Sequence, residues 1–102
     1  MYKDLKVYER SYKLAMSIYR FSATMPEDER YGLTSQMKRA ATSIPLNIAE
    51  GYGKGDTKPE QKRYLKMAKG SCSELEVLID MCKDLGFMPK EAHAKGSTYQ
   101  IR

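Results

Sequence analysis

The sequence predicts an all-α fold built from amphipathic helices, and three observations support this prediction. Apolar residues recur at every third or fourth position along three long segments, which is the spacing of one helix face. A capping box, Thr57-Lys-Pro-Glu60, stands directly before one of these segments and marks a helix start. The composition, 41% hydrophobic and 30% charged with a mean hydropathy of -0.65, suits helices with one solvated face. At 102 residues the chain is expected to form one domain, 1–102.

The first helix is predicted over about 4–23, and it carries two apolar lines. One line has the alternating three- and four-residue steps of a bundle seam and comprises Leu5, Tyr8, Tyr12, Ala15 and Tyr19. The other line lies on another face and comprises Val7, Leu14, Ile18 and Phe21. One buried face is enough for a monomeric bundle. The second line therefore predicts a contact outside the bundle, such as another subunit, and we interpret the three tyrosines as core or interface residues.

The second helix is predicted over about 33–51, from the spacing of Leu33, Met37, Ala40, Ile44 and Ile48. Pro45 interrupts its hydrogen bonding and frees the Ala41 carbonyl, at a cost of ~3 kcal/mol in an ordinary helix interior. Thr42 and Ser43 are close enough in sequence to help satisfy the freed backbone groups.

Asn47 and Glu50 are polar residues beside the apolar line of this helix. A buried asparagine must be hydrogen-bonded, and one such residue in a bundle can specify register and oligomeric state. Glu50 is positioned to pair with Lys54, four residues on, or to accept hydrogen bonds across a subunit interface. We interpret both residues as structural, with direct contact to a ligand as the alternative.

The third helix is predicted over about 58–85. Thr57 is the expected N-cap, with Glu60 reaching back to it and Pro59 in the first turn. Gly86 is the expected C-terminal stop. The seam of this helix comprises Leu65, Ala68, Cys72, Leu75, Ile79 and Cys82.

Three further features of the C-terminal half lead to predictions. Gly70-Ser71 lowers helix propensity, by about 1 kcal/mol for the glycine, and predicts a close approach to another helix. Cys72 and Cys82 lie ten residues apart, about 15 Å along a helix, which is too far for a disulfide. A fourth helix is predicted only as a short segment, 89–96, because no longer amphipathic pattern follows Pro89.

No motif predicts catalysis, a metal site or a cofactor. Ser35-Gln-Met-Lys38 matches the S-x-x-K pattern of serine acyltransferases without its companion elements. Gly51-Tyr-Gly-Lys-Gly55 differs from the dinucleotide fingerprint and follows a helix. With His93 as the single histidine, no zinc set can be assembled at standard spacing. A signal-like N-terminus and a long apolar run are both absent, which predicts a cytoplasmic protein with no membrane partner.

Charge is concentrated in one segment. The net charge is +5, and residues 54–69 hold six basic and two acidic residues, a local net charge of +4. The basic residues are Lys54, Lys58, Lys62, Arg63, Lys66 and Lys69, and Lys38 and Arg39 add to them from the second helix. Lys62, Lys66 and Lys69 share one helix face, as phosphate contacts require. The alternative is a solvated face that keeps the bundle soluble. Tyr52, between two glycines, is a candidate for stacking on a base.

Several motifs resemble one known family. The run from Leu33 to Gly51, with Glu29-Arg-Tyr-Gly before it and Tyr52-Gly53 after it, resembles the signature of the bacterial four-helix bundle proteins. This family is also known as the 23S ribosomal RNA intervening-sequence proteins, and it includes accessory proteins of diversity-generating retroelements. Further similar motifs are Asp4-Leu-Lys-Val-Tyr8, Leu65-Lys-Met-Ala-Lys-Gly70-Ser71, Glu74-Leu75-Glu76 and Leu85-Gly86-Phe87.

The resemblance implies a fold and a function. The implied fold is an up-down antiparallel four-helix bundle, whose fourth helix is short or truncated in this chain. The implied function is that of a non-enzymatic homo-oligomer, commonly a pentamer, that binds RNA or a nucleic-acid-processing protein through a basic face. The alternative is a purely structural or regulatory protein–protein interaction module without nucleic-acid binding, which the two apolar lines of the first helix favour.

Overall fold

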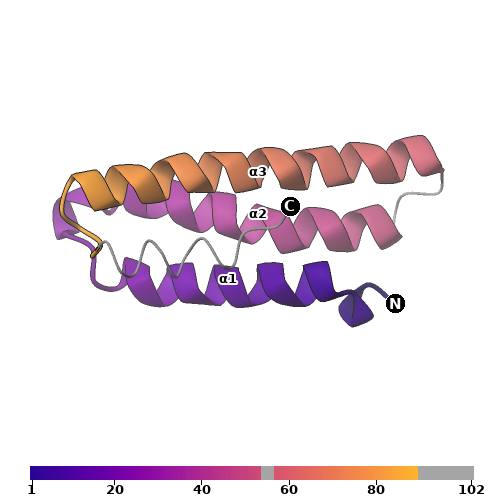
Figure 1. Ribbon diagram of the computed structural model, residues 1–102, viewed down its shortest axis with the longest axis horizontal. Helices are drawn as coiled ribbons and strands as arrows, with labels where there is room; N and C mark the ends of the chain where they lie inside the picture. Colours follow the sequence, from indigo (N-terminus) through magenta and orange to yellow (C-terminus); the bar gives the residue numbers. More distant parts are fainter. Residues whose placement is uncertain (54–56, 90–102) are drawn as a thin grey trace.

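The computed structural model describes residues 1–53 and 57–89, and over these residues the fold is all-helical (Figure 1). The helices α1 (Lys6–Ser22), α2 (Leu33–Gly53) and α3 (Lys58–Asp84) run up, down and up. Short 3-10 helices precede α1 and α2, namely η1 (Tyr2–Asp4) and η2 (Glu27–Glu29). The predicted all-α class is confirmed. Lys54, His93 and all but the first residue of the predicted fourth helix, 89–96, lie outside the described residues.

α2 is the central helix of the described structure. It packs against α1 on one side and against α3 on the other, whereas no Cα atoms of α1 and α3 come within 8 Å of each other over the described ranges. Figure 1 shows the same order, with α2 drawn between the other two helices. Side chains of α1 and α3 nevertheless share one hydrophobic core over α2.

A side chain from the preceding turn caps the start of α2. The Glu29 carboxylate accepts a hydrogen bond of 3.2 Å from the Leu33 backbone N–H, which satisfies one of the free donors of the first turn. Gly32 leaves room for this cap, because a methyl group there would come within 2.9 Å of the Glu29 Oε1 atom. The run Glu29-Arg-Tyr-Gly-Leu33 therefore works as a helix start.

α2 continues through Pro45 to Gly53, and the hydroxyls near Pro45 do not act as predicted. The Thr42 hydroxyl donates to the carbonyl oxygens of Lys38 and Arg39, at 2.8 and 3.2 Å. The Ser43 hydroxyl donates to the Ala40 carbonyl, at 3.0 Å. The prediction that they serve the groups freed by Pro45 is wrong, because a serine or threonine hydroxyl in a helix reaches back to carbonyls three or four residues earlier.

α3 begins at the predicted cap. Thr57 has extended backbone and its hydroxyl accepts a hydrogen bond of 3.3 Å from the Glu60 backbone N–H. A left-handed glycine, Gly86, with φ of 80° follows the C-terminal end of α3, as expected of a helix stop. The Phe87 N–H then donates to the Cys82 carbonyl, at 2.8 Å, which completes the end of the helix.

The close approach between α2 and α3 occurs at Gly51 and not at Gly70. Gly51 is buried, and a methyl group on it would come within 3.1 Å of the Tyr64 Cβ atom. Gly70 is exposed, and over the described residues nothing lies within 4 Å of the corresponding position. The described residues therefore provide no close approach at Gly70 itself. Its neighbour Ser71 does face α2, since the hydroxyls of Ser43 and Ser71 are hydrogen-bonded.

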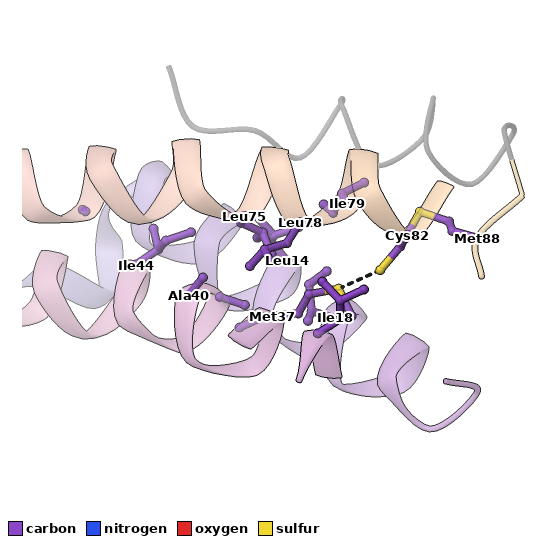
Figure 2. Packing of buried hydrophobic residues seen from close by; sticks show 14 of the residues in the cluster. Leu14, Ile18, Met37, Ala40, Ile44, Leu75, Leu78, Ile79, Cys82 and Met88 are labelled. Atoms are coloured by element: carbon purple, nitrogen blue, oxygen red, sulfur yellow. Dashed lines mark hydrogen bonds between the residues drawn. The ribbon is translucent and has the colours of Figure 1, made fainter. Parts of the chain in front are cut away.

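The core joins all three helices (Figure 2). Its best-buried large side chains include Met37, Ile44 and Leu75, at 0 to 2% exposure. The Cys82 thiol is also fully buried and lies 3.6 Å from the Met37 sulfur. Burial raises the pKa of this thiol, and the nearby Glu29 carboxylate adds to the effect, so Cys82 is a neutral core residue. Neither Cys72 nor Cys82 forms a disulfide.

Candidate nucleic-acid interface

Lys62, Lys66 and Lys69 lie on one exposed side of α3, beside its contact with the core. Together with Val7, Ile48, Leu65 and Ala68 they line a hollow of about 360 Å³. No carboxylate lies within 4.0 Å of any of the three ammonium groups in the part of the chain that the structure describes. The surface therefore combines an apolar floor with three cations that are not neutralised by ion pairs with described residues.

The other predicted basic residues do not all join this surface. α2 and α3 are antiparallel, with Gly51 beside Tyr64 and Met37 beside Cys82. Lys62 therefore lies near the C-terminal end of α2. Lys38 precedes Gly51 by thirteen residues, which is about 20 Å along the helix. The structure thus separates Lys38 and Arg39 from the three lysines of α3.

Each remaining predicted basic residue has a different setting. Lys58 is exposed in the first turn of α3. The Arg63 guanidinium lies over the ring of Tyr64, 5.2 Å from its centroid. Lys54 lies outside the described residues. Tyr52, the candidate for base stacking, is 57% exposed near the end of α2.

Asn47 and Glu50 are both half-buried on α2. The Asn47 side-chain amide donates to the Ser43 carbonyl of its own helix, at 2.8 Å. This bond uses one of the N–H donors of the Asn47 amide within its own helix. The predicted pairing of Glu50 with Lys54 falls outside the described residues.

A groove rich in tyrosine lies between α1 and α2, and sequence reasoning did not predict it. We call it the tyrosine groove, and its volume is about 420 Å³. Its walls are Tyr2 of η1, then Tyr8, Tyr12, Ala15, Met16 and Tyr19 of α1, and Thr42, Pro45, Leu46 and Ala49 of α2. The signal for it was the first apolar line of α1, which was assigned to a bundle seam. Tyr12 and Tyr19 are 52% and 46% exposed, so they are not core residues of the described bundle, and their interface role stays a prediction.

Aromatic contacts order one end of the tyrosine groove. The rings of Tyr2 and Tyr8 meet edge to face, with centroids 4.9 Å apart, and those of Tyr8 and Tyr12 are 6.1 Å apart. At the other end, the Lys38 ammonium lies 5.0 Å from the centroid of the Tyr19 ring, within the range of a cation–π interaction. The groove therefore has ordered rings and a cation at its edge.

The charges around the tyrosine groove are mainly positive. Lys3, Glu9 and Lys13 line a neighbouring hollow that shares Tyr8 and Tyr12 with the groove. The Lys13 ammonium pairs with the Glu9 carboxylate at 3.0 Å. A hydrogen bond from Lys13 and its positive charge hold the pKa of Glu9 below its usual value. Once Lys13 and Glu9 are counted as a neutral pair, Lys3 and Lys38 give the surroundings of the groove a net positive charge.

Neither a metal cluster nor a membrane span was found in the described parts of the chain. Residues 1–53 and 57–89 contain no group of three or more histidine, cysteine, aspartate or glutamate side chains that could hold a metal ion. None of the described helices is both long enough and apolar enough to cross a bilayer.

The fold and these surfaces define a helical-bundle protein with exposed basic and aromatic faces. The family model of the 23S rRNA-intervening sequence proteins matches residues 3–99. The chain therefore belongs to the 23S rRNA-intervening sequence protein family, and the recognition from its motifs is confirmed. A comparison with curated proteins gave no match.

Proposed function

We propose that this chain is a non-enzymatic, cytoplasmic, homo-oligomeric protein that binds RNA, or a nucleic-acid-processing protein, through its basic face. One observation carries the proposal: Lys62, Lys66 and Lys69 are exposed on the same side of α3 around an open hollow. Each lysine that neutralises a phosphate releases condensed counterions, which makes such a stripe a source of nucleic-acid affinity. Family membership supports an RNA-related role.

An exposed apolar stripe supports the oligomeric part of the proposal. Met67, Val77, Met81 and Leu85 are 45 to 59% exposed. At 100° per residue they fall on one side of α3. Exposed apolar side chains gathered on one side of a helix mark interaction sites more often than scattered ones do. We propose that copies of the chain meet there in a ring of five subunits, with Asn47 and Glu50 close to the contact and 89–96 forming the fourth helix of each bundle.

The alternative function is a protein–protein interaction module without nucleic-acid binding. The same apolar stripe favours it, because such a surface suits another protein as well as a second copy. The alternative and the main proposal differ in what the three lysines do. In the alternative they only keep the bundle soluble.

Replacing Lys62, Lys66 and Lys69 together with glutamate tests the main proposal. Binding of a labelled RNA, measured by fluorescence anisotropy at low salt, is expected to be abolished. The bundle should stay folded by circular dichroism, because all three side chains are exposed. For the unmodified protein, log K should fall with log salt with a slope of about 0.7–0.9 per phosphate contact.

The matched control replaces Lys6, Arg10 and Arg20 of α1 with glutamate, because these exposed cations line neither the lysine hollow nor the tyrosine groove, and it should alter binding less. RNA binding that survives the triple α3 change would place the interface elsewhere. If the unmodified protein binds no RNA at low salt, the interaction-module function is the better description.

The Asn47→Leu variant tests the proposed assembly. We expect folded helices and an altered distribution of oligomers by light scattering, because a polar residue that becomes buried at a contact between copies specifies association more than it stabilises. Thr42→Val, a change on another side of α2, is the control. An unmodified protein that is monomeric at micromolar concentration would contradict the oligomer, and an unchanged distribution in the variant would remove Asn47 from the contact.

A further inference from the structure

We propose that the tyrosine groove between α1 and α2 holds the bases of single-stranded RNA. This inference rests on the proposed RNA-binding function and adds a second contact surface to it. The groove lies on the other side of α1 from the three α3 lysines, because Tyr8 faces the groove whereas Val7 faces the lysine hollow. An RNA strand that engages both surfaces would place its bases in the tyrosine groove and its phosphates against the three α3 lysines.

The tyrosine rings suit stacking. Tyr12 and Tyr19 are each about half exposed, so part of each ring is open to a planar partner. They lie seven residues apart, which is two helix turns and about 10.5 Å along α1. Stacked bases rise by about 3.4 Å, so the span between the rings suits two bases. The small side chains of Ala15, Thr42 and Ala49 form part of the surface between and opposite the rings.

The surrounding charge suits phosphate. The Lys38 ammonium is held 5.0 Å from the Tyr19 centroid, so a nucleotide whose base packs against Tyr19 brings its phosphate to a cation. Lys3 lines the neighbouring hollow that shares Tyr8 and Tyr12 with the groove. Glu9, the carboxylate lining this end, is already neutralised by Lys13. A groove of aromatic rings flanked by cations is the general design of single-strand binding sites.

The groove favours single strands over duplexes. Stacking on a side chain needs an unpaired base with a free face, and bases inside a duplex have none. A second copy of the chain is the other possible occupant of such an apolar surface. The flanking cations distinguish the two occupants, because a copy of a chain with net charge +5 would bring no excess of negative charge.

The test uses a fluorescein-labelled short oligouridine and the full chain at about 50 mM salt. Tyr12→Ala and Tyr19→Ala are each expected to weaken binding by about 5- to 100-fold. Tyr12→Phe and Tyr19→Phe keep the ring and should bind within about twofold of the unmodified chain. Lys38→Gln should lower the slope of log K against log salt by about 0.7. The same oligouridine annealed to oligoadenine should be bound without sensitivity to Tyr12.

Tyr31→Ala is the matched control, because Tyr31 is 87% exposed and lies outside the groove, and its binding should be unchanged. If the unmodified chain binds oligouridine and Tyr12→Ala binds it equally well, this inference is overturned while the proposed function stands. A smaller assembly for Tyr12→Ala in light scattering, with RNA binding retained, would also overturn it and assign the groove to a contact between copies. An unmodified chain that binds no RNA would overturn the proposed function and this inference with it.

Discussion

The two apolar lines of α1 have similar spacing and opposite fates. Leu14 and Ile18 are buried at 4 to 5% exposure against α2 and α3, whereas Tyr12 and Tyr19 are about half exposed along the tyrosine groove. The tyrosine line follows the three- and four-residue steps of a helix seam, and the leucine line, with steps of seven, four and three residues, also keeps to one helix face. The difference shows that residue spacing identifies the helix faces that can be buried. The arrangement of the neighbouring helices then decides which of these faces is actually buried. In the described structure Leu14 and Ile18 face the core shared by the three helices, whereas Tyr12 and Tyr19 border α2 only across the open groove.

A pair of alanine substitutions tests this comparison with the largest expected effect. Leu14→Ala should lower the free energy of unfolding by about 2–5 kcal/mol, as for other buried leucines. Tyr12→Ala should lower it by less than about 1 kcal/mol, because roughly half of the ring is already in solvent. Chemical denaturation at a fixed protein concentration measures both values. Equal losses would mean that the tyrosine side of α1 is as well covered in solution as the leucine side.

A pair of glycine substitutions extends the comparison to α2 and α3 with a smaller effect. Gly70→Ala should raise the free energy of unfolding by about 0.5–1 kcal/mol, because the site is exposed and alanine favours a helix. Gly51→Ala should lower it by up to about 2 kcal/mol, since its methyl group would crowd the Tyr64 Cβ atom by more than the propensity gain offsets. Thermal denaturation measures the stability of each variant relative to the unmodified protein. A more stable Gly51→Ala protein would show that α3 can move away from α2 at little cost.

The helices were predictable because their signals are local. Thr57 and Gly86 mark the two ends of α3 by side-chain capping and by a left-handed backbone, and neither depends on the rest of the fold. Gly51 and Gly70 illustrate a feature that local sequence signals do not predict, namely which helical glycine lies against another helix. Both are helical glycines in the sequence, and only the packing of α2 on α3 places Tyr64 against one of them. The helix register likewise decides that Lys38 lies beside Tyr19 rather than beside Lys62.

The candidate sites were predictable to different degrees for the same reason. Lys62, Lys66 and Lys69 belong to one helix, so their common exposed side follows from spacing alone. The tyrosine groove needs two helices, and its α2 wall of Thr42, Pro45, Leu46 and Ala49 has no pattern of its own in the sequence. A site shared between elements becomes visible only when their relative placement is known.

The antiparallel pairing of α2 with α3 has a consequence for the order of folding. Its contacts grow steadily longer in sequence: thirteen residues separate Gly51 from Tyr64, 28 separate Ser43 from Ser71, and 45 separate Met37 from Cys82. Closing the longest of these loops directly costs about 1 kcal/mol more conformational entropy than closing the shortest. Once Gly51 and Tyr64 meet, each further pair closes only a small additional loop. We therefore expect the hairpin of α2 and α3 to form from the Gly51–Tyr64 contact outward, with the buried Met37–Cys82 contact the last of the three.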